Sequence, residues 1–236
     1  MILPIVVLAG GLATRLRPIT VKIPKSLIAI NDIPFVLHQL NLFQQNGINH
    51  VHFCLGHLGK MVENVVNESI FSKTMKITYS YDGETLLGTG GAIKKALPFL
   101  PDTFFVTYGD SFLDIDYQSI ESRFLKSVQE NYGLMTIFKN SNQFDTSNVI
   151  FENSRIHLYS KKQLTDKMDY IDYGLGILRK SHFNNYLDQT PFDLSDIYEK
   201  LSINGELIGH EAHERFYEIG SVKGIDDLSI YLKTKK

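Results

Sequence analysis

The chain has 236 residues, of which 43% are hydrophobic and 21% charged, with a formal net charge of −2 at pH 7. These values are ordinary for one globular domain, and the charge balance gives no general basic field for nucleic acid or anionic membranes. The one cysteine, Cys54, excludes an intrachain disulfide and suits a reducing compartment. We therefore expect a cytoplasmic protein that binds neither nucleic acid nor membranes, with assembly into a homo-oligomer left open.

The first half of the chain alternates strand-like and helix-like segments. The expected strands are 2–8, 51–55, 76–81, 103–108 and 134–138, and the expected helices are 35–46, 60–66, 92–97 and 117–130. This alternation predicts an α/β fold with a Rossmann-like, mostly parallel sheet flanked by helices. Ligands of such sheets bind beyond the carboxyl ends of the strands, so the residues after each strand are the first candidates for a site.

The second half has a different pattern. Segments 148–152 and 155–159 resemble an antiparallel hairpin around Asn153 and Ser154, followed by a strand at 170–178 and helices at 194–203 and 228–235. No repeat or linker interrupts the chain. We expect a single domain over 1–236, with a first half of about 1–140 and a second half of about 141–236 that carries a small antiparallel extension.

The loop after the first strand has the composition of a phosphate-binding loop. Gly10 and Gly11 allow backbone N–H groups to approach a phosphate, and Thr14 adds a hydroxyl donor. Arg15 and Lys25 can neutralise a triphosphate. The loop lacks the Gly-Lys-Ser/Thr ending of the Walker pattern, and Arg15 stands where a dinucleotide-binding pattern needs its third glycine. The sequence therefore predicts a phosphate-binding loop that belongs to neither the Walker pattern nor the dinucleotide-binding pattern.

The same loop resembles the signature of the sugar-phosphate nucleotidyltransferases, Gly-Gly-x-Gly-Thr-Arg-Leu-x-Pro-x-Thr followed by Pro-Lys-x-Leu. Ala13 stands where that family usually has glycine. The matching residues are Gly10, Gly11, Thr14, Arg15, Leu16, Pro18, Thr20, Pro24, Lys25 and Leu27. The resemblance implies catalytic roles for Arg15, Lys25 and Asp110. It also implies a nucleotide site in the first half, formed by Leu8, Ala9, Gly10, Gly11, Thr14, Arg15, Gly88 and Thr89.

Two carboxylates are the candidates for a magnesium site. Asp110 follows an apolar strand within a Gly-Asp pair, and Mg²⁺ prefers one or two protein carboxylates together with phosphate oxygens and water. In the family this aspartate binds the metal. Glu218 falls on the aspartate of the family's late motif Trp-x-Asp-x-Gly-Thr, where the resemblance implies the second ligand of Mg²⁺.

The base and acceptor sites are also expected from the resemblance. Residues 87–92, Leu-Gly-Thr-Gly-Gly-Ala, match a family element that packs against the base and ribose. Lys161 or Lys162 lies where the family often has Glu-Lys, although Ser160 replaces the glutamate. Asp172 and Gly174 fall on the family's Asn-x-Gly strand. The resemblance implies that these four residues, Lys161, Lys162, Asp172 and Gly174, bind the acceptor.

The whole chain is most similar to short bacterial enzymes that activate heptose 1-phosphate, mannose 1-phosphate or related sugars, which implies GTP as the donor and Mg²⁺ as the cofactor. Its expected partners are therefore a nucleoside triphosphate and a sugar phosphate. A cytidylyl- or uridylyltransferase acting on another phosphorylated acceptor, and a non-catalytic sensor, stay open as alternatives.

Two other motifs point to competing functions. The pair Asp114 and Asp116 has the Asp-x-Asp pattern of many glycosyltransferases, which lack a basic glycine loop after the first strand. His210 and His213 are three residues apart, whereas the zinc-binding helix motif needs four. We therefore expect neither a glycosyltransferase nor a zinc site.

Overall fold

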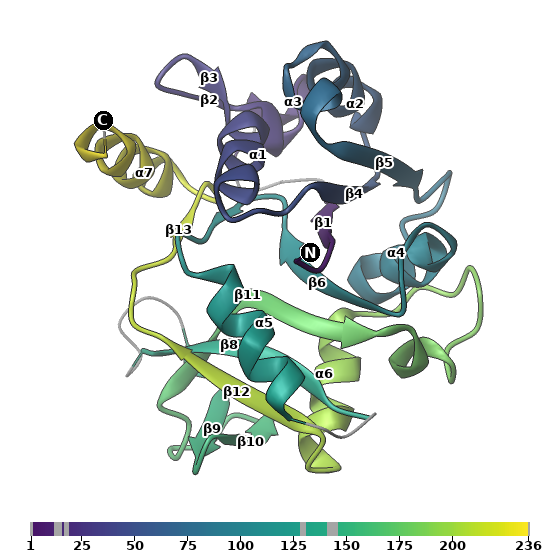
Figure 1. The fold of residues 1–236 in the computed structure, drawn as a ribbon, viewed down its shortest axis with the longest axis vertical. Coiled ribbons are helices and arrows are strands. Elements are labelled where there is room, and N and C mark those ends of the chain that lie inside the picture. The colour runs from purple at the N-terminus through teal and green to yellow at the C-terminus, as the bar shows by residue number, and fades with distance from the viewer. Residues whose placement is uncertain (1, 12–15, 17–18, 128–130, 141–145, 236) are drawn as a thin grey trace.

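The structure is a computed structural model that describes residues 2–11, 16, 19–127, 131–140 and 146–235. Within these ranges nine strands form one sheet in the order β5-β4-β1-β6-β11-β8-β12-β10-β9, with β9 also paired to β11 (Figure 1). Its strands are β1 (Ile5–Ala9), β4 (His50–Leu55), β5 (Lys76–Tyr81), β6 (Thr103–Tyr108), β8 (Gly133–Lys139), β9 (Val149–Glu152), β10 (Arg155–Tyr159), β11 (Tyr170–Arg179) and β12 (Leu207–Ala212).

Helices surround this sheet, and short elements connect them. The helices are α1 (Phe35–Gln45), α2 (Gly59–Glu68), α3 (Phe71–Thr74), α4 (Gly88–Ala96), α5 (Tyr117–Lys126), α6 (Leu194–Ile203) and α7 (Val222–Thr234), and the 3-10 turns are η2 (Ile19–Val21), η3 (Lys25–Leu27), η4 (Leu97–Phe99) and η5 (Lys180–Phe183). Two short ladders join β2 (Ala29–Ile30) to β3 (Ile33–Pro34) and β7 (Ser111–Phe112) to β13 (Tyr217–Glu218). None of the described helices is long and apolar enough to cross a membrane.

The sheet is parallel only in part. β5, β4, β1 and β6 are mutually parallel, as the alternating pattern predicts. β11 runs antiparallel to β6, β8 and β9, whereas β12 is parallel to β8. A parallel neighbour needs a crossover, usually a helix, and the described residues between β8 and β11 form only the strands β9 and β10. The α/β class is therefore as expected, but the sheet as a whole is mixed rather than mostly parallel.

The core has two layers because side chains of β1 alternate between the faces of the sheet. Ile5 and Val7 pack with side chains of α1, α2 and α5 on one face. Val6 and Leu8 pack with side chains of α4 and α6 on the other. β1 is therefore buried on both sides, and it lies between β4 and β6 in the sheet.

Several elements differ from the sequence-based expectation. α4 begins at Gly88 rather than at residue 92, although glycine disfavours helix. α7 begins at Val222 rather than at residue 228, because the Ser221 side chain accepts a hydrogen bond from the N–H of Gly224 and caps an earlier first turn. β12 begins at Leu207, whereas the sequence favoured a strand only around residues 210–213.

Candidate active site

A cavity of about 250 Å³ opens at the carboxyl ends of four neighbouring strands. Leu8 and Ala9 of β1, Cys54 of β4 and Tyr108 of β6 line it, and Asp82 lines it from just beyond β5. Its wall also contains Gly10, Gly11, Lys25, Ser26, Leu86, Gly88, Thr89, Ala92, Gly109 and Asp110. The structure thus brings Lys25, Asp110 and the described nucleotide-site residues together around one cavity. Thr14 and Arg15 lie outside the described residues.

The glycine loop leaves room at the cavity. A Cβ built on Gly11 would meet no described atom within 4 Å, and its φ is not positive. Neither packing nor backbone conformation therefore requires glycine there among the described residues. A phosphate approaching the backbone N–H groups is a physical reason for the missing side chain.

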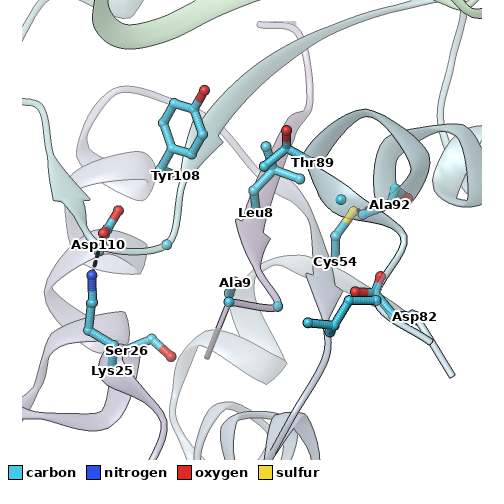
Figure 2. Close-up of a pocket in the computed structure, with 15 residues that line it drawn as sticks. Leu8, Ala9, Lys25, Ser26, Cys54, Asp82, Thr89, Ala92, Tyr108 and Asp110 are labelled. Atoms are coloured by element: carbon cyan, nitrogen blue, oxygen red, sulfur yellow. Dashed lines mark hydrogen bonds and ion pairs between the residues drawn. The ribbon is translucent and has the colours of Figure 1, made fainter. Parts of the chain in front are cut away.

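The turn after β6 carries the candidate metal ligand against β1. A Cβ on Gly109 would lie 2.7 Å from Ala9 Cβ, and the Gly109 N–H donates to Leu8 O at 2.8 Å, so only glycine allows this approach. The next residue, Asp110, accepts a hydrogen bond from Lys25 Nζ at 2.7 Å (Figure 2). This ion pair holds a cation and a carboxylate at one side of the cavity before any ligand is present.

Gln39 of α1 fixes the same turn from behind. Its Nε2 donates to Tyr108 O at 2.9 Å and to Ser111 O at 2.7 Å, and its side chain is 1% exposed. These two carbonyls flank the Gly109–Asp110 pair. The position of Asp110 therefore depends on a helix residue that carries no sequence signal of a functional role.

The glycine-rich start of α4 is shaped by the segment before α6. A Cβ on Gly90 would lie 2.2 Å from the Phe192 ring, and the Phe192 carbonyl accepts the Gly90 N–H at 3.0 Å. Thr89 Oγ1 accepts the N–H of Leu194 at 2.8 Å. Gly88, with φ at +69°, would place a Cβ 2.5 Å from Phe192 O. The group that lies close to the backbone of these glycines is therefore Phe192 of the same chain. Gly88 and Thr89 still line the cavity.

The second carboxylate lies on a neighbouring strand rather than in the cavity wall. Glu218 of β13 pairs with Ser111 of β7, and the N–H of Ile219 donates to Asp110 O at 3.0 Å. Glu218 lines a second, separate hollow with Leu16 and residues 220–222. Its role as a metal ligand stays a prediction.

The donor set fits Mg²⁺ only with help from a substrate. Within the described ranges no group of three or more His, Cys, Asp or Glu side chains converges to hold a metal. Asp110 and Glu218 offer hard oxygen donors on adjoining elements, and Mg²⁺ usually completes its shell with phosphate oxygens and water. The residues present therefore suit a magnesium ion that arrives with a nucleotide.

The Asp-x-Asp pair has structural partners. Asp114 Oδ2 accepts hydrogen bonds from Tyr231 and Lys235 of the C-terminal segment, which anchors α7 to the body of the protein. Asp116 caps α5 by accepting the N–H groups of Gln118 and Ser119. These contacts explain the pair without a nucleotide-sugar ligand.

The four predicted acceptor residues do not line the cavity. Asp172 Oδ1 accepts the N–H of Gly174 at 2.9 Å, within a bulge of β11 where Gly174 has φ at +97°. Burial raises the pKa of the Asp172 carboxyl, and the Gly174 N–H and the charge of Lys161 partly oppose this. The pKa of Tyr108 is raised mainly by burial and secondly by the charge of Asp172. Tyr108 lines the cavity, so Asp172 acts on one of the residues of the cavity wall.

The two candidate lysines contact the start of α6. Lys161 Nζ lies 3.7 Å from Asp193 Oδ1, and Lys162 Nζ lies 3.5 Å from Asp196 Oδ1. The side chain of Ser160, which replaces the family's glutamate, is buried and accepts the N–H groups of Lys162 and Gln163. Ser160 thus shapes the turn that carries the lysines.

Sequence reasoning missed several residues of the cavity wall. Asp82 directly follows β5, so the strand-end rule that selected Asp110 applies to it equally. Tyr108 and Cys54 are strand residues whose types are common in cores, and no pattern distinguished them. Burial raises the pKa of the Cys54 thiol to about 12.

Comparison with known proteins gives the same picture. Residues 5–184 match the family described as Nucleotidyl transferase. The chain is 29% identical over 201 residues to the D-glycero-alpha-D-manno-heptose 1-phosphate guanylyltransferase of Campylobacter jejuni, covering 83% of this chain and 86% of that protein. It is 24% identical to the catalytic subunit beta of mannose-1-phosphate guanylyltransferase from Xenopus tropicalis, covering 97% of this chain but 64% of that protein.

A solved structure shares the fold. HddC from Yersinia pseudotuberculosis, complexed with GMP-PN, superposes with a TM-score of 0.78 at 22% identity, covering 98% of this chain and 99% of that one. The match over most of the chain, together with the cavity at the strand ends, confirms the resemblance seen in the glycine loop. The chain belongs to the nucleotidyl transferase family.

Proposed function

We propose that the chain transfers a guanylyl group from GTP to a sugar 1-phosphate in the cytoplasm, with Mg²⁺, and releases pyrophosphate. Its family and relatives make it a sugar-1-phosphate nucleotidyltransferase. The observation that carries the proposal is the Lys25–Asp110 pair, which lies beside the open Gly10–Gly11 loop in one cavity. The names of the Campylobacter relative and of the HddC complex support a guanine nucleotide as the donor.

The proposed reaction needs positioning and charge neutralisation more than proton transfer. A phosphate oxygen of the acceptor attacks the α-phosphorus of the nucleotide and forms a new P–O bond. The bond from the α-phosphorus to the bridging oxygen breaks, and pyrophosphate leaves with that electron pair. Because the attacking oxygen is already anionic, no general base is required. The protein must hold two anions in line against their mutual repulsion.

The chain's own residues divide this work. Lys25 would neutralise charge where the α-phosphate and the acceptor phosphate meet, and Arg15 would stabilise the leaving pyrophosphate. Gly10 and Gly11 would bind phosphate oxygens through their backbone N–H groups. Asp110 and Glu218 would hold Mg²⁺, which when bound withdraws charge from the phosphoryl oxygens. Lys161 or Lys162 and Asp172 would bind the acceptor.

The test is pyrophosphate release with Mg²⁺ across the four ribonucleoside triphosphates and a panel of phosphorylated acceptors. The panel includes mannose 1-phosphate, heptose 1-phosphate, glucose 1-phosphate and phosphorylated alcohols. We expect release with GTP and a sugar 1-phosphate. Release only with CTP and a phosphorylated alcohol would replace the proposed donor and acceptor. A protein that binds GTP but releases no pyrophosphate with any acceptor would instead be a sensor.

A further inference from the structure

The Lys25–Asp110 ion pair joins two residues whose proposed ligands carry opposite charges. Lys25 Nζ lies 2.7 Å from Asp110 Oδ2, and the two side chains are 15% and 29% exposed (Figure 2). A metal ion on Asp110 would bring a second cation against the Lys25 ammonium. A phosphate at Lys25 would bring a second anion against the Asp110 carboxylate. The ion pair therefore competes with the proposed ligand of each partner.

The backbones that carry the two charges are fixed. Lys25 begins η3, and the N–H of Ile28 donates to Lys25 O at 3.0 Å. Gln39 holds the carbonyls on either side of the Gly-Asp turn, and the N–H of Ile219 donates to Asp110 O at 3.0 Å. Separation of the two charges therefore depends on rotation of their side chains, chiefly the flexible four-carbon stem of the lysine.

Either ligand alone would leave one of these charges without its partner. A metal ion that takes Asp110 strands the partly buried ammonium, and a phosphate that takes Lys25 strands the carboxylate next to an anion. Removing one partner of a partly buried pair costs more than the pair itself contributes, because the other charge stays behind uncompensated. When both ligands arrive, Lys25 exchanges carboxylate for phosphate, Asp110 exchanges ammonium for metal, and every charge stays paired.

We propose that the Lys25–Asp110 pair is a partner-exchange switch that makes the binding of metal and of triphosphate mutually dependent. Each residue blocks the ligand of the other until both ligands are present, and the coupling is reciprocal, as binding linkage requires. The inference rests on the proposed function for the ligand that each residue takes. It goes beyond that function because it concerns how the two ligands depend on each other before an acceptor binds.

Mn²⁺ tests the metal side without any nucleotide, because it takes oxygen ligands as Mg²⁺ does and its free concentration is read by electron paramagnetic resonance. Lys25→Met keeps the length of the side chain without its charge. It should bind Mn²⁺ about 10- to 100-fold more tightly than the unmodified chain, the effect of one hydrogen bond to a charged group. Lys22→Met is the matched control, because Lys22 is exposed, lies three residues earlier and does not line the cavity. Its Mn²⁺ affinity should equal that of the unmodified chain.

Inorganic triphosphate with EDTA tests the phosphate side, because it carries the phosphates of any nucleoside triphosphate without a base or a metal. Asp110→Asn releases Lys25, so calorimetry should show about 10- to 100-fold tighter binding of triphosphate than in the unmodified chain. Glu84→Gln is the matched control, because Glu84 is an exposed carboxylate that does not line the cavity. Its affinity for triphosphate should equal that of the unmodified chain.

The double variant Lys25→Met/Asp110→Asn separates partner exchange from simple repulsion. The gain in Mn²⁺ affinity should require Asp110 and the gain in triphosphate affinity should require Lys25, so the double variant should show neither. A gain from Asp110→Asn that persists when Lys25 is already methionine would show that the carboxylate only repels phosphate, and would overturn the proposal. So would equal Mn²⁺ affinities of Lys25→Met and the unmodified chain. Because the expected changes are gains of affinity, a misfolded variant cannot imitate them.

These measurements involve neither turnover nor the identity of the base. Gains in both single variants, together with no pyrophosphate release on the acceptor panel, would refute the proposed reaction and leave the partner exchange intact. Pyrophosphate release with GTP, together with affinities that are equal across the variants, would refute the partner exchange and leave the proposed reaction intact.

Discussion

His52 gives the fold a calculable sensitivity to acid. Its ring is fully buried in β4, with Nδ1 2.8 Å from Thr78 Oγ1 and Nε2 3.0 Å from Ser80 Oγ, and it stacks on Phe99. Burial, and secondly the nearby His50, lowers the pKa of His52 from 6.5 to about 4. Between these two pKa values, His52 is therefore neutral in the native protein and protonated in the unfolded chain.

The sign and size follow from proton linkage. Between pH 6.5 and pH 4 the unfolded chain binds a proton at this site and the native protein does not, so falling pH favours unfolding. The stability is fully present above pH 6.5 and is lost as pH falls to about 4, where the loss reaches about 3 kcal/mol. Between pH 7 and pH 5 it amounts to about 2 kcal/mol, or about 4–8 °C in melting temperature for a chain of this size.

The assay is urea unfolding at pH 7 and at pH 5 for three proteins. In His52→Gln an amide replaces the ring and cannot be protonated in this range, so its free energy of unfolding should fall about 2 kcal/mol less than that of the unmodified chain. His57→Gln, at an exposed histidine, should follow the unmodified chain. Other buried histidines and carboxylates contribute to the pH dependence of all three proteins. Their contribution cancels when the changes in the free energy of unfolding are compared. The same pH dependence in His52→Gln and in the unmodified chain would refute the reasoning.

Three further outcomes follow from the site. Asp110→Asn removes the carboxylate that pairs with Lys25, so pyrophosphate release should fall by about 100-fold or more while circular dichroism stays unchanged; near-normal release would remove Asp110 from the machinery. Gly90→Ala puts a methyl 2.2 Å from the Phe192 ring and should cost about 1–3 kcal/mol in thermal unfolding, with Phe192→Leu in the same chain recovering part of it. Cys54, with its pKa raised to about 12, should react with a thiol reagent at pH 8 only on unfolding, and prompt reaction of the folded protein would contradict its burial.

Local patterns in the sequence predict the parts of the site that follow from strand ends. Gly10 follows β1 directly, and Asp110 follows β6 after one glycine. Parallel strands bring their carboxyl ends to one edge, so the meeting of these residues at one cavity was predictable. Asp82 obeys the same rule but belongs to no short motif that the resemblance covers. Gln39 and Phe192 act on residues about 70 and 100 positions away in the chain. Such contacts depend on packing between helices and loops, which residue patterns do not encode.

The directions of the later strands were predictable to a lesser degree. The hairpin of β9 and β10 follows from Asn153 and Ser154, which adopt the positive φ values that a tight turn needs. The antiparallel placement of β11 beside β6 depends on pairing between strands that are far apart in the chain. Alternating hydrophobic residues set the faces of a strand but not its neighbour or its direction.

Of the two candidate lysines of the proposed acceptor site, Lys161 is better placed than Lys162 to contact a sugar phosphate. Both lysines pair with carboxylates at the start of α6 at 3.5 to 3.7 Å. Such exposed pairs contribute only about 0–1 kcal/mol, so an incoming phosphate can displace either carboxylate. Only Lys161 also lowers the pKa of Asp172, which places its charge near the bulge of β11 and Tyr108. Lys161→Ala should therefore raise the KM for the acceptor by about tenfold with the KM for GTP unchanged, because a charge-assisted contact to the phosphate is lost. Lys162→Ala is the matched control, and an equal effect of both substitutions would show that neither lysine is specifically placed.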